Sequence, residues 1–217
     1  MSPNASSGSH VWWTSLKHGG LLIAPSHLVQ YFPADVPPLH GYLEERLRRD
    51  VMRSEDGRAE SMTKLLDTVL EHVLGFEDDP SGGPGRGRWL KGSSMPSELS
   101  VRTMTGTAAK PRRFWKGPYR SVLPVFVHPD SEVRLGIGRG RRATSEVVEW
   151  LRTTGHRIAL LTNGRQWRLV YAGLDYDAFV EWDTALWFEE GKAGRQVGAL
   201  MALLGRQALV PRVEGDQ

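Results

Sequence analysis

Hydrophobic positions recur at helical spacing in the first part of the chain. Between about residues 60 and 74 they fall at i, i+3, i+4 and i+7, the spacing of one buried helical face, and Gly75 ends the run. The stretch LHGYLEERLRRDVMR, which follows Pro37-Pro38, predicts an earlier helix. The apolar stretch before it, VWWTSLKHGGLLIAPSHLVQYFP, is broken by glycine and proline and predicts an irregular segment packed on the domain.

The period of the pattern shortens after Trp89. Five short stretches bounded by glycine or proline are rich in β-formers and predict strands: RWLKG, SVRTMTG, PRRFWKG, SVLPVFV and RLGIG. RATSEVVEWLRTTG then predicts a crossover helix, with Thr144 or Ser145 as its cap, Glu146 in its first turn and Arg152 near its end. AFVEWDT predicts a further strand, and RQVGALMALLGRQ predicts a last helix.

A hairpin is expected between this crossover helix and AFVEWDT, in IALLTNGRQWRLVYAG at residues 158–173. Asn163-Gly164 supplies a turn that tolerates positive φ. We expect Trp167 to anchor the hairpin in the core and Arg165 to point outward. Arg165 is either a solvated side chain or a binding residue.

This order of elements predicts an α/β fold with a mixed sheet flanked by helices and an N-terminal helical extension. Residues 1–10, rich in Ser, Asn and Gly, are expected to be disordered. Residues 11–58 are expected to form the extension with its helix, and residues 59–212 the α/β domain.

Charge is distributed unevenly along the chain. The net charge is only +3, but residues 86–142 hold 13 Lys and Arg against three acids, a net of +10, and the remainder carries a net of −7. A solvated surface usually mixes the two signs, so this segregation indicates a polyanionic partner.

The basic residues gather in two motifs and the hairpin. KPRRFWKGPYR interleaves cations with aromatics, which suits phosphate contact with base stacking, although the aromatics could equally be core with snorkelling cations. The Gly-rich stretch LGIGRGRR precedes the crossover helix and predicts an arginine loop, with a solvated turn as the alternative. The candidate DNA-binding residues are Lys110, Arg112, Arg113, Lys116, Arg120, Arg139, Arg141, Arg142 and Arg165.

Several classes of protein lack their signatures here. There is no cysteine, the seven histidines do not have the spacing of a metal site, and neither a P-loop nor a G-x-S-x-G motif occurs. No apolar run approaches the roughly 20 residues of a membrane span, and the N-terminus lacks the features of a secretory signal. We therefore expect a cytoplasmic protein without membrane contact.

The helix ending in VLEHVLGF, the basic strands, the crossover helix and the LLTNGRQWRLVYAG hairpin together resemble the N-terminal nuclease-like domain of restriction–modification proteins. That family includes type I restriction subunits and type IIG-like enzymes, among them adenine methylases of phage defence. The resemblance covers about residues 60–185. It implies a restriction-endonuclease-like fold, DNA as partner, and further domains or subunits of a restriction or defence complex.

The PD-(D/E)xK catalytic residues of that fold are missing from the matching strands. The family places an acid on one strand and an acid-x-lysine on the next to hold a metal, whereas this chain has KPRRFWKG and SVLPVFVH. Asp130 and Glu132 repeat the residue types but stand only two residues apart. We therefore predict a DNA-engaging domain without catalytic residues, metal or cofactor.

Two alternatives remain: an active nuclease domain that uses Mg²⁺, indicated by two or more carboxylates clustered near Arg112 and Val125, or a protein-interaction module that docks on an acidic partner subunit. S-adenosylmethionine would be a cofactor only of a separate methylase domain, because its motifs are absent here.

Overall fold

The computed structural model describes residues 10–79, 81, 86–189 and 192–210. Seven strands form one mixed sheet in the order β1-β9-β8-β7-β6-β5-β2. Only β6 (Val122–Val127) and β7 (Ile158–Thr162) are parallel, and the crossover helix α5 (Gly140–Thr154) joins them. The α/β class and the mixed sheet flanked by helices are thus as the sequence predicts.

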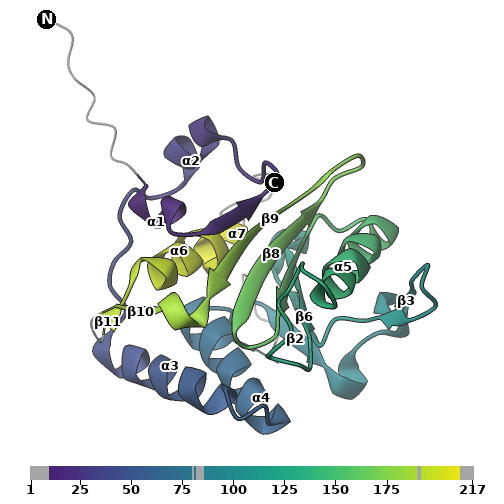
Figure 1. The fold of residues 1–217 in the computed structure, drawn as a ribbon, viewed down its shortest axis with the longest axis horizontal. Helices are drawn as coiled ribbons and strands as arrows, with labels where there is room; N and C mark the ends of the chain where they lie inside the picture. Colours follow the sequence, from purple (N-terminus) through teal and green to yellow (C-terminus); the bar gives the residue numbers. More distant parts are fainter. Residues whose placement is uncertain (1–9, 80, 82–85, 190–191, 211–217) are drawn as a thin grey trace, which may run out of the picture.

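Three antiparallel strands of the sheet lie directly before the crossover helix, and three more lie directly after it. β2 (Arg88–Lys91), β5 (Arg113–Lys116) and β6 form a meander, and β8 (Gln166–Ala172) pairs with both β7 and β9 (Asp177–Asp183). Figure 1 shows the long β8–β9 hairpin beside α5.

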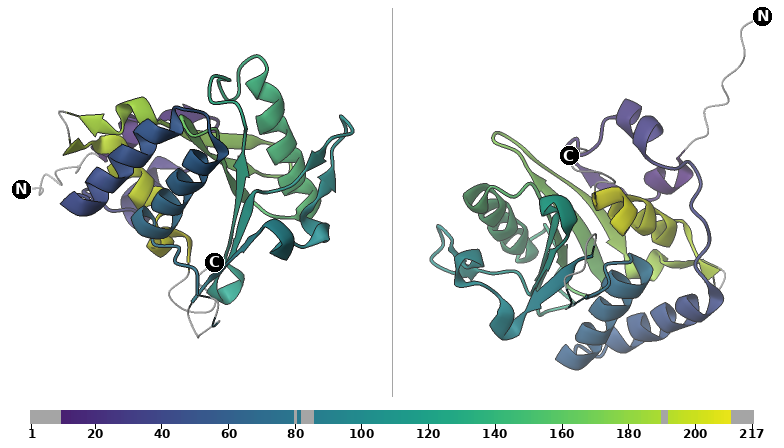
Figure 2. Two further views of the ribbon diagram at one scale, coloured as in Figure 1. Left: turned by 90° about the horizontal axis from the view of Figure 1, so that it is seen from below. Right: turned by 180° about the vertical axis from the view of Figure 1, so that it is seen from behind.

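Alternation along the strands divides the core into two layers. On one face, Trp115, Val125, Trp167 and Trp182 pack against helices. These helices are α3 (Gly41–Ser54), α4 (Ala59–Asp67), the π-helical turn η1 (Thr68–Val73) and α6 (Arg195–Leu204). The opposite face packs against α5 and a small hairpin, and Figure 2 shows α5 on the other side of the sheet from these helices.

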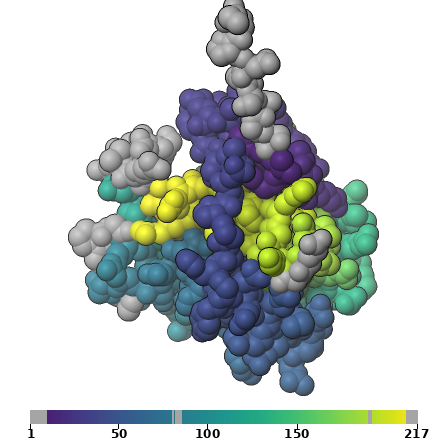
Figure 3. All heavy atoms as spheres, turned by 90° about the vertical axis from the view of Figure 1, so that its left-hand side faces the viewer, coloured from purple at the N-terminus to yellow at the C-terminus, as the bar shows by residue number. Residues whose placement is uncertain are grey.

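The N-terminal residues belong to the same core. β1 (Lys17–Gly19) is the edge strand of the sheet, paired with β9, where the sequence predicts an irregular segment. It lies between the short helices α1 (Val11–Thr14) and α2 (Pro25–Tyr31). Leu39 packs in the core, and Val36 contacts Gly198 of α6. Figure 3 shows this connection crossing the molecule between the N-terminal helices and α3. Residues on both sides of the boundary expected at residue 58 therefore share one hydrophobic core. The expected disorder of residues 1–10 concerns a stretch of which only His10 is described.

Two short strand pairs lie outside the main sheet. β3 (Val101–Arg102) pairs with β4 (Ala108–Ala109), so SVRTMTG begins a separate hairpin, and β10 (Phe188–Glu189) pairs with β11 (Lys192–Ala193). Five more short elements complete the set: η2 (Gly92–Ser94), η3 (Ser97–Leu99), η4 (Pro118–Arg120), η5 (Thr184–Leu186) and α7 (Arg206–Leu209). The predicted strand RLGIG is a loop with a single bridge between Leu135 and Gly140.

Within the described residues, no helix is long and apolar enough to cross a membrane.

Candidate nucleic-acid interface

Strand register brings three distant segments to one end of the sheet. Arg113 pairs with Val125 near the end of β6, and Val127 pairs with Thr162 at the end of β7. The segments 110–112, 128–142 and 163–165 therefore meet at the end of the sheet where β6 and β7 terminate. They hold seven Lys or Arg residues and two acids. We call these three segments the basic end of the sheet.

Six of the nine candidate residues lie at the basic end and are exposed: Lys110, Arg112, Arg139, Arg141, Arg142 and Arg165. Among the described residues, Lys110, Arg112, Arg139 and Arg141 have no ion-pair partner. Arg142 pairs with Glu146 at 2.9 Å, and Arg165 approaches Asp183 at 4.0 Å. Arg134, which sequence reasoning did not single out, also lies here, exposed and without an ion-pair partner among the described residues.

Arg113 is the one candidate that the structure buries. Its side chain is 4% exposed and pairs with Asp67 of α4 at 2.7 Å, with Glu71 of η1 at 3.7 Å. It also donates to the Thr63 carbonyl. A guanidinium that is buried and paired with two carboxylates is not accessible to a phosphate. The burial of Arg113 therefore argues against a contact with DNA, and the residue instead fixes α4 and η1 to the sheet.

Lys116 and Arg120 are exposed but lie at the opposite end of the sheet, because β5 runs away from Arg112. Arg120 and Tyr119 both have positive φ, +61° and +52°, in the tight turn between β5 and β6. A partner that binds at the basic end therefore need not contact Lys116 or Arg120.

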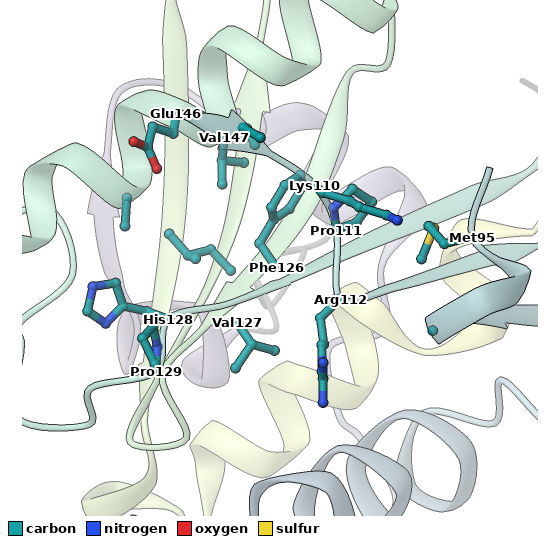
Figure 4. A pocket seen from close by; sticks show the side chains of 15 residues that line it. Met95, Lys110, Pro111, Arg112, Phe126, Val127, His128, Pro129, Glu146 and Val147 are labelled. Atoms are coloured by element: carbon teal, nitrogen blue, oxygen red, sulfur yellow. The ribbon is translucent and has the colours of Figure 1, made fainter. Parts of the chain in front are cut away.

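A cavity of about 420 Å³ opens at the basic end on the α5 face of the sheet. Its floor is apolar, and polar side chains stand around it from the segment before β5, the segment after β6 and α5. Figure 4 shows Phe126 between Lys110 and Arg112 on one side and His128 on the other, with Glu146 above. The small β3–β4 hairpin forms another wall through Ala108 and Ala109.

This hairpin is fixed to α5 at its tip. Thr107 donates to Glu146 at 2.7 Å, and the Met104 backbone N–H donates to Glu149 at 2.6 Å. The sequence predicts Glu146 in the first turn of the helix, but it lies further along α5, where it accepts hydrogen bonds at the contact with the hairpin. The helix begins earlier, at Gly140, and no side chain caps it.

The hairpin motif TNGRQWR positions the arginine loop. Asn163 donates to the carbonyls of Ser131 at 3.2 Å and Val133 at 2.8 Å, and its own Oδ1 accepts from the Gln166 N–H. The side chain of Gln166 accepts from the Leu135 N–H at 2.8 Å. Only Gly164 takes positive φ in the turn, at +89°. Both polar side chains are buried, so the loop that carries Arg134 and Arg139 and leads to Arg141 at the start of α5 is held on the sheet.

Arg168, which the sequence pattern does not single out, forms a second buried link between this hairpin and the loop. Its guanidinium pairs with Glu181 on β9, donates to the Leu135 carbonyl at 2.8 Å and lies over the Phe179 ring at 3.9 Å. Gly136, with φ +78°, leaves room for it, because a Cβ there would lie 2.2 Å from Arg168 Nη1. Opposite charges at facing positions of two apolar strands are the signal that could have found this pair.

Two carboxylates, Asp67 and Glu71, lie near Val125 and its partner Arg113. Asp67 and Glu71 lie on the opposite face of the sheet from the cavity and surround the guanidinium of Arg113. Burial raises the pKa of Glu71, and the neighbouring Asp67 raises it further. In the part of the chain that the structure describes, no three Asp, Glu, His or Cys side chains group as metal ligands.

No family model, curated protein or solved structure matches this chain.

Proposed function

We propose that this chain binds duplex DNA through the basic end of the sheet, in a nuclease-like domain of a restriction–modification or phage-defence enzyme. The observation that carries the proposal is the convergence of exposed cations without ion-pair partners on one face. Cations that neutralise no acid within the described structure are available to replace the counterions of a phosphate backbone.

The spacing of these cations suits a duplex. β5 and β8 are three strand spacings apart, roughly 14 Å at about 4.8 Å each. At a rise of about 3.4 Å, this distance covers roughly four base pairs. Arg112 directly precedes β5, and Arg165 directly precedes β8.

The element order supports the nuclease-like part of the proposal. A helix, three antiparallel strands, a crossover helix and a parallel strand followed by the TNGRQW hairpin occur in the order that the resemblance implies. The cavity lining includes Arg112 just before β5, Phe126 in β6 and His128 just after β6. An arginine, a phenylalanine and a histidine do not supply the carboxylate oxygens that Mg²⁺ prefers, so no Mg²⁺-dependent step is assigned to the site.

The salt dependence of DNA binding tests the interface. Arg139→Gln with Arg141→Gln should reduce the slope of log affinity against log salt by about 2, because each lost phosphate contact removes about 0.9. Lys116→Gln with Arg120→Gln removes the same charge at the far end of the sheet and should leave the slope close to that of the wild type. Fluorescence anisotropy with a random-sequence duplex at several salt concentrations measures both.

Equal losses in the two double variants would contradict the proposed interface, since only net charge would then matter. Wild-type protein that binds no DNA at low salt but binds an acidic polypeptide would favour a protein-interaction module instead.

Incubation with supercoiled plasmid tests the absence of cleavage. With Mg²⁺ or Mn²⁺ the pure chain should produce no nicked product, because the cavity holds a single carboxylate, Glu146. Nicking that disappears in Asp130→Ala with Glu132→Ala would overturn this expectation and establish an active nuclease. Nicking that persists in that variant and in Glu146→Ala would instead be assigned to a contaminant.

A further inference from the structure

The cavity at the basic end has the size and lining of a site for a small amphipathic molecule. Its volume of about 420 Å³ lies within the range of about 300–1,000 Å³ typical of ligand sites. Phe126, Pro111, Val147 and Leu161 form an apolar surface, which suits the face of a flat ring. A duplex backbone alone has no group that would fill such a hollow.

Cationic and acidic groups stand on different sides of this apolar surface. Lys110 and Arg112 have no ion-pair partner in the described chain and can receive a phosphate. Glu146 accepts from Arg142 and Thr107 through Oε1, while no described residue donates to its Oε2. A free carboxylate oxygen accepts hydrogen from an exocyclic amine, as it does from cytosine N4.

We infer that the cavity receives one unpaired nucleotide of the bound DNA, with its base on the apolar surface and its phosphate at Lys110 and Arg112. The inference rests on the proposed function, because the duplex beside the cavity is bound through the basic end. The shared chemistry is that of a nucleoside monophosphate, and a free mononucleotide would meet the same groups.

Glu146 gives the site a preference among bases. Adenine and cytosine present an exocyclic amine, whereas thymine presents carbonyl oxygens that a carboxylate repels. An unpaired adenine or cytosine should therefore be bound more tightly than an unpaired thymine. Glu146→Gln should reduce this difference, because an amide serves both donor and acceptor groups.

The test compares a fully paired duplex with the same duplex carrying one bulged nucleotide. Wild-type protein should bind the bulged cytosine duplex about tenfold more tightly, which corresponds to about 1.4 kcal/mol. Ala108→Trp fills the cavity from an exposed strand position and should abolish this preference while leaving binding of the paired duplex unchanged. Ala143→Leu, from the α5 wall, is the second blocking variant.

Ala185→Trp is the matched control, because Ala185 is exposed and does not line the cavity. It should keep the preference. Free dCMP should compete for the bulged duplex, and inorganic phosphate at the same concentration should not. Competition by dCMP in wild type but not in Ala108→Trp assigns free and DNA-borne nucleotide to the same cavity.

Two failures are distinguishable. Binding of both duplexes without preference, or a preference that both blocking variants retain, overturns the nucleotide site and leaves the proposed function intact. Absence of binding to either duplex removes the proposed function, and the cavity is then tested by the thermal shift that dCMP produces in wild type against Ala108→Trp. No shift in wild type overturns the inference as well.

Discussion

Arg168→Met should lower the free energy of unfolding by about 3–5 kcal/mol, the usual result of breaking a buried ion pair. Arg168 and Glu181 are 2% and 5% exposed, and the variant leaves the carboxylate in the protein interior. Lys17 at 3.3 Å and Gln166 at 2.9 Å are then its remaining partners. The Leu135 carbonyl also loses a donor. Urea unfolding of the two proteins measures the difference.

The double variant Arg168→Met with Glu181→Leu should recover much of this loss, because neither charge then stays buried alone. Arg152→Met is the surface control. Its pair with Asp177 is long and exposed, at 3.8 Å, and its loss should cost less than about 1 kcal/mol. A double variant as unstable as the single one would mean that the pair contributes through its contacts to the loop rather than through charge.

Trp167→Ala should cost about 3–5 kcal/mol, as truncation of a large buried aromatic does. The indole is fully buried, donates to the Gly164 carbonyl at 3.2 Å and packs against Trp187 with centroids 5.7 Å apart. Its burial confirms the expected anchor. Thermal and urea unfolding check the effect.

The same hairpin offers two comparisons. Gly164→Val should also destabilise, because φ is +89° and a Cβ there would lie 2.7 Å from Met62 Cε. Arg165→Ala should leave stability within about 0.5 kcal/mol, since the residue is exposed, and should weaken DNA binding by one charge. A stable Trp167→Ala that no longer binds DNA would contradict the core role of the indole, and an Arg165→Ala that unfolds would contradict its outward role.

Local pattern predicts much of the fold. The helix in LHGYLEERLRRDVMR, the apolar face at 60–74 and the 158–173 hairpin follow from periodicity and turn chemistry, which act over a few residues. β1 has three residues and no alternation of its own, so only its pairing with β9 makes it a strand. α5 starts at Gly140 because of backbone hydrogen bonds with the loop before it, and the hydrophobic periodicity of the sequence does not predict such bonds.

The candidate site is predictable to a different extent. Composition indicates the basic segment, and strand register alone separates Lys116 and Arg120 from the other cations. The burial of Arg113 depends on acids more than 40 residues earlier, Asp67 and Glu71. The cavity likewise requires the β3–β4 hairpin to close over α5. Contacts between residues so far apart in the sequence cannot be predicted from the pattern of a short segment.

The residues that hold the arginine loop and the residues that it displays are different. The side chains of Asn163, Gln166 and Arg168 form hydrogen bonds with its backbone at Ser131, Val133 and Leu135. These bonds do not involve the side chains at the outer positions of the loop. Ile137, Arg139 and Arg141 are all exposed. The exposed side chains of the loop can therefore be substituted, in evolution or by design, while the hydrogen bonds that hold its backbone on the sheet are kept.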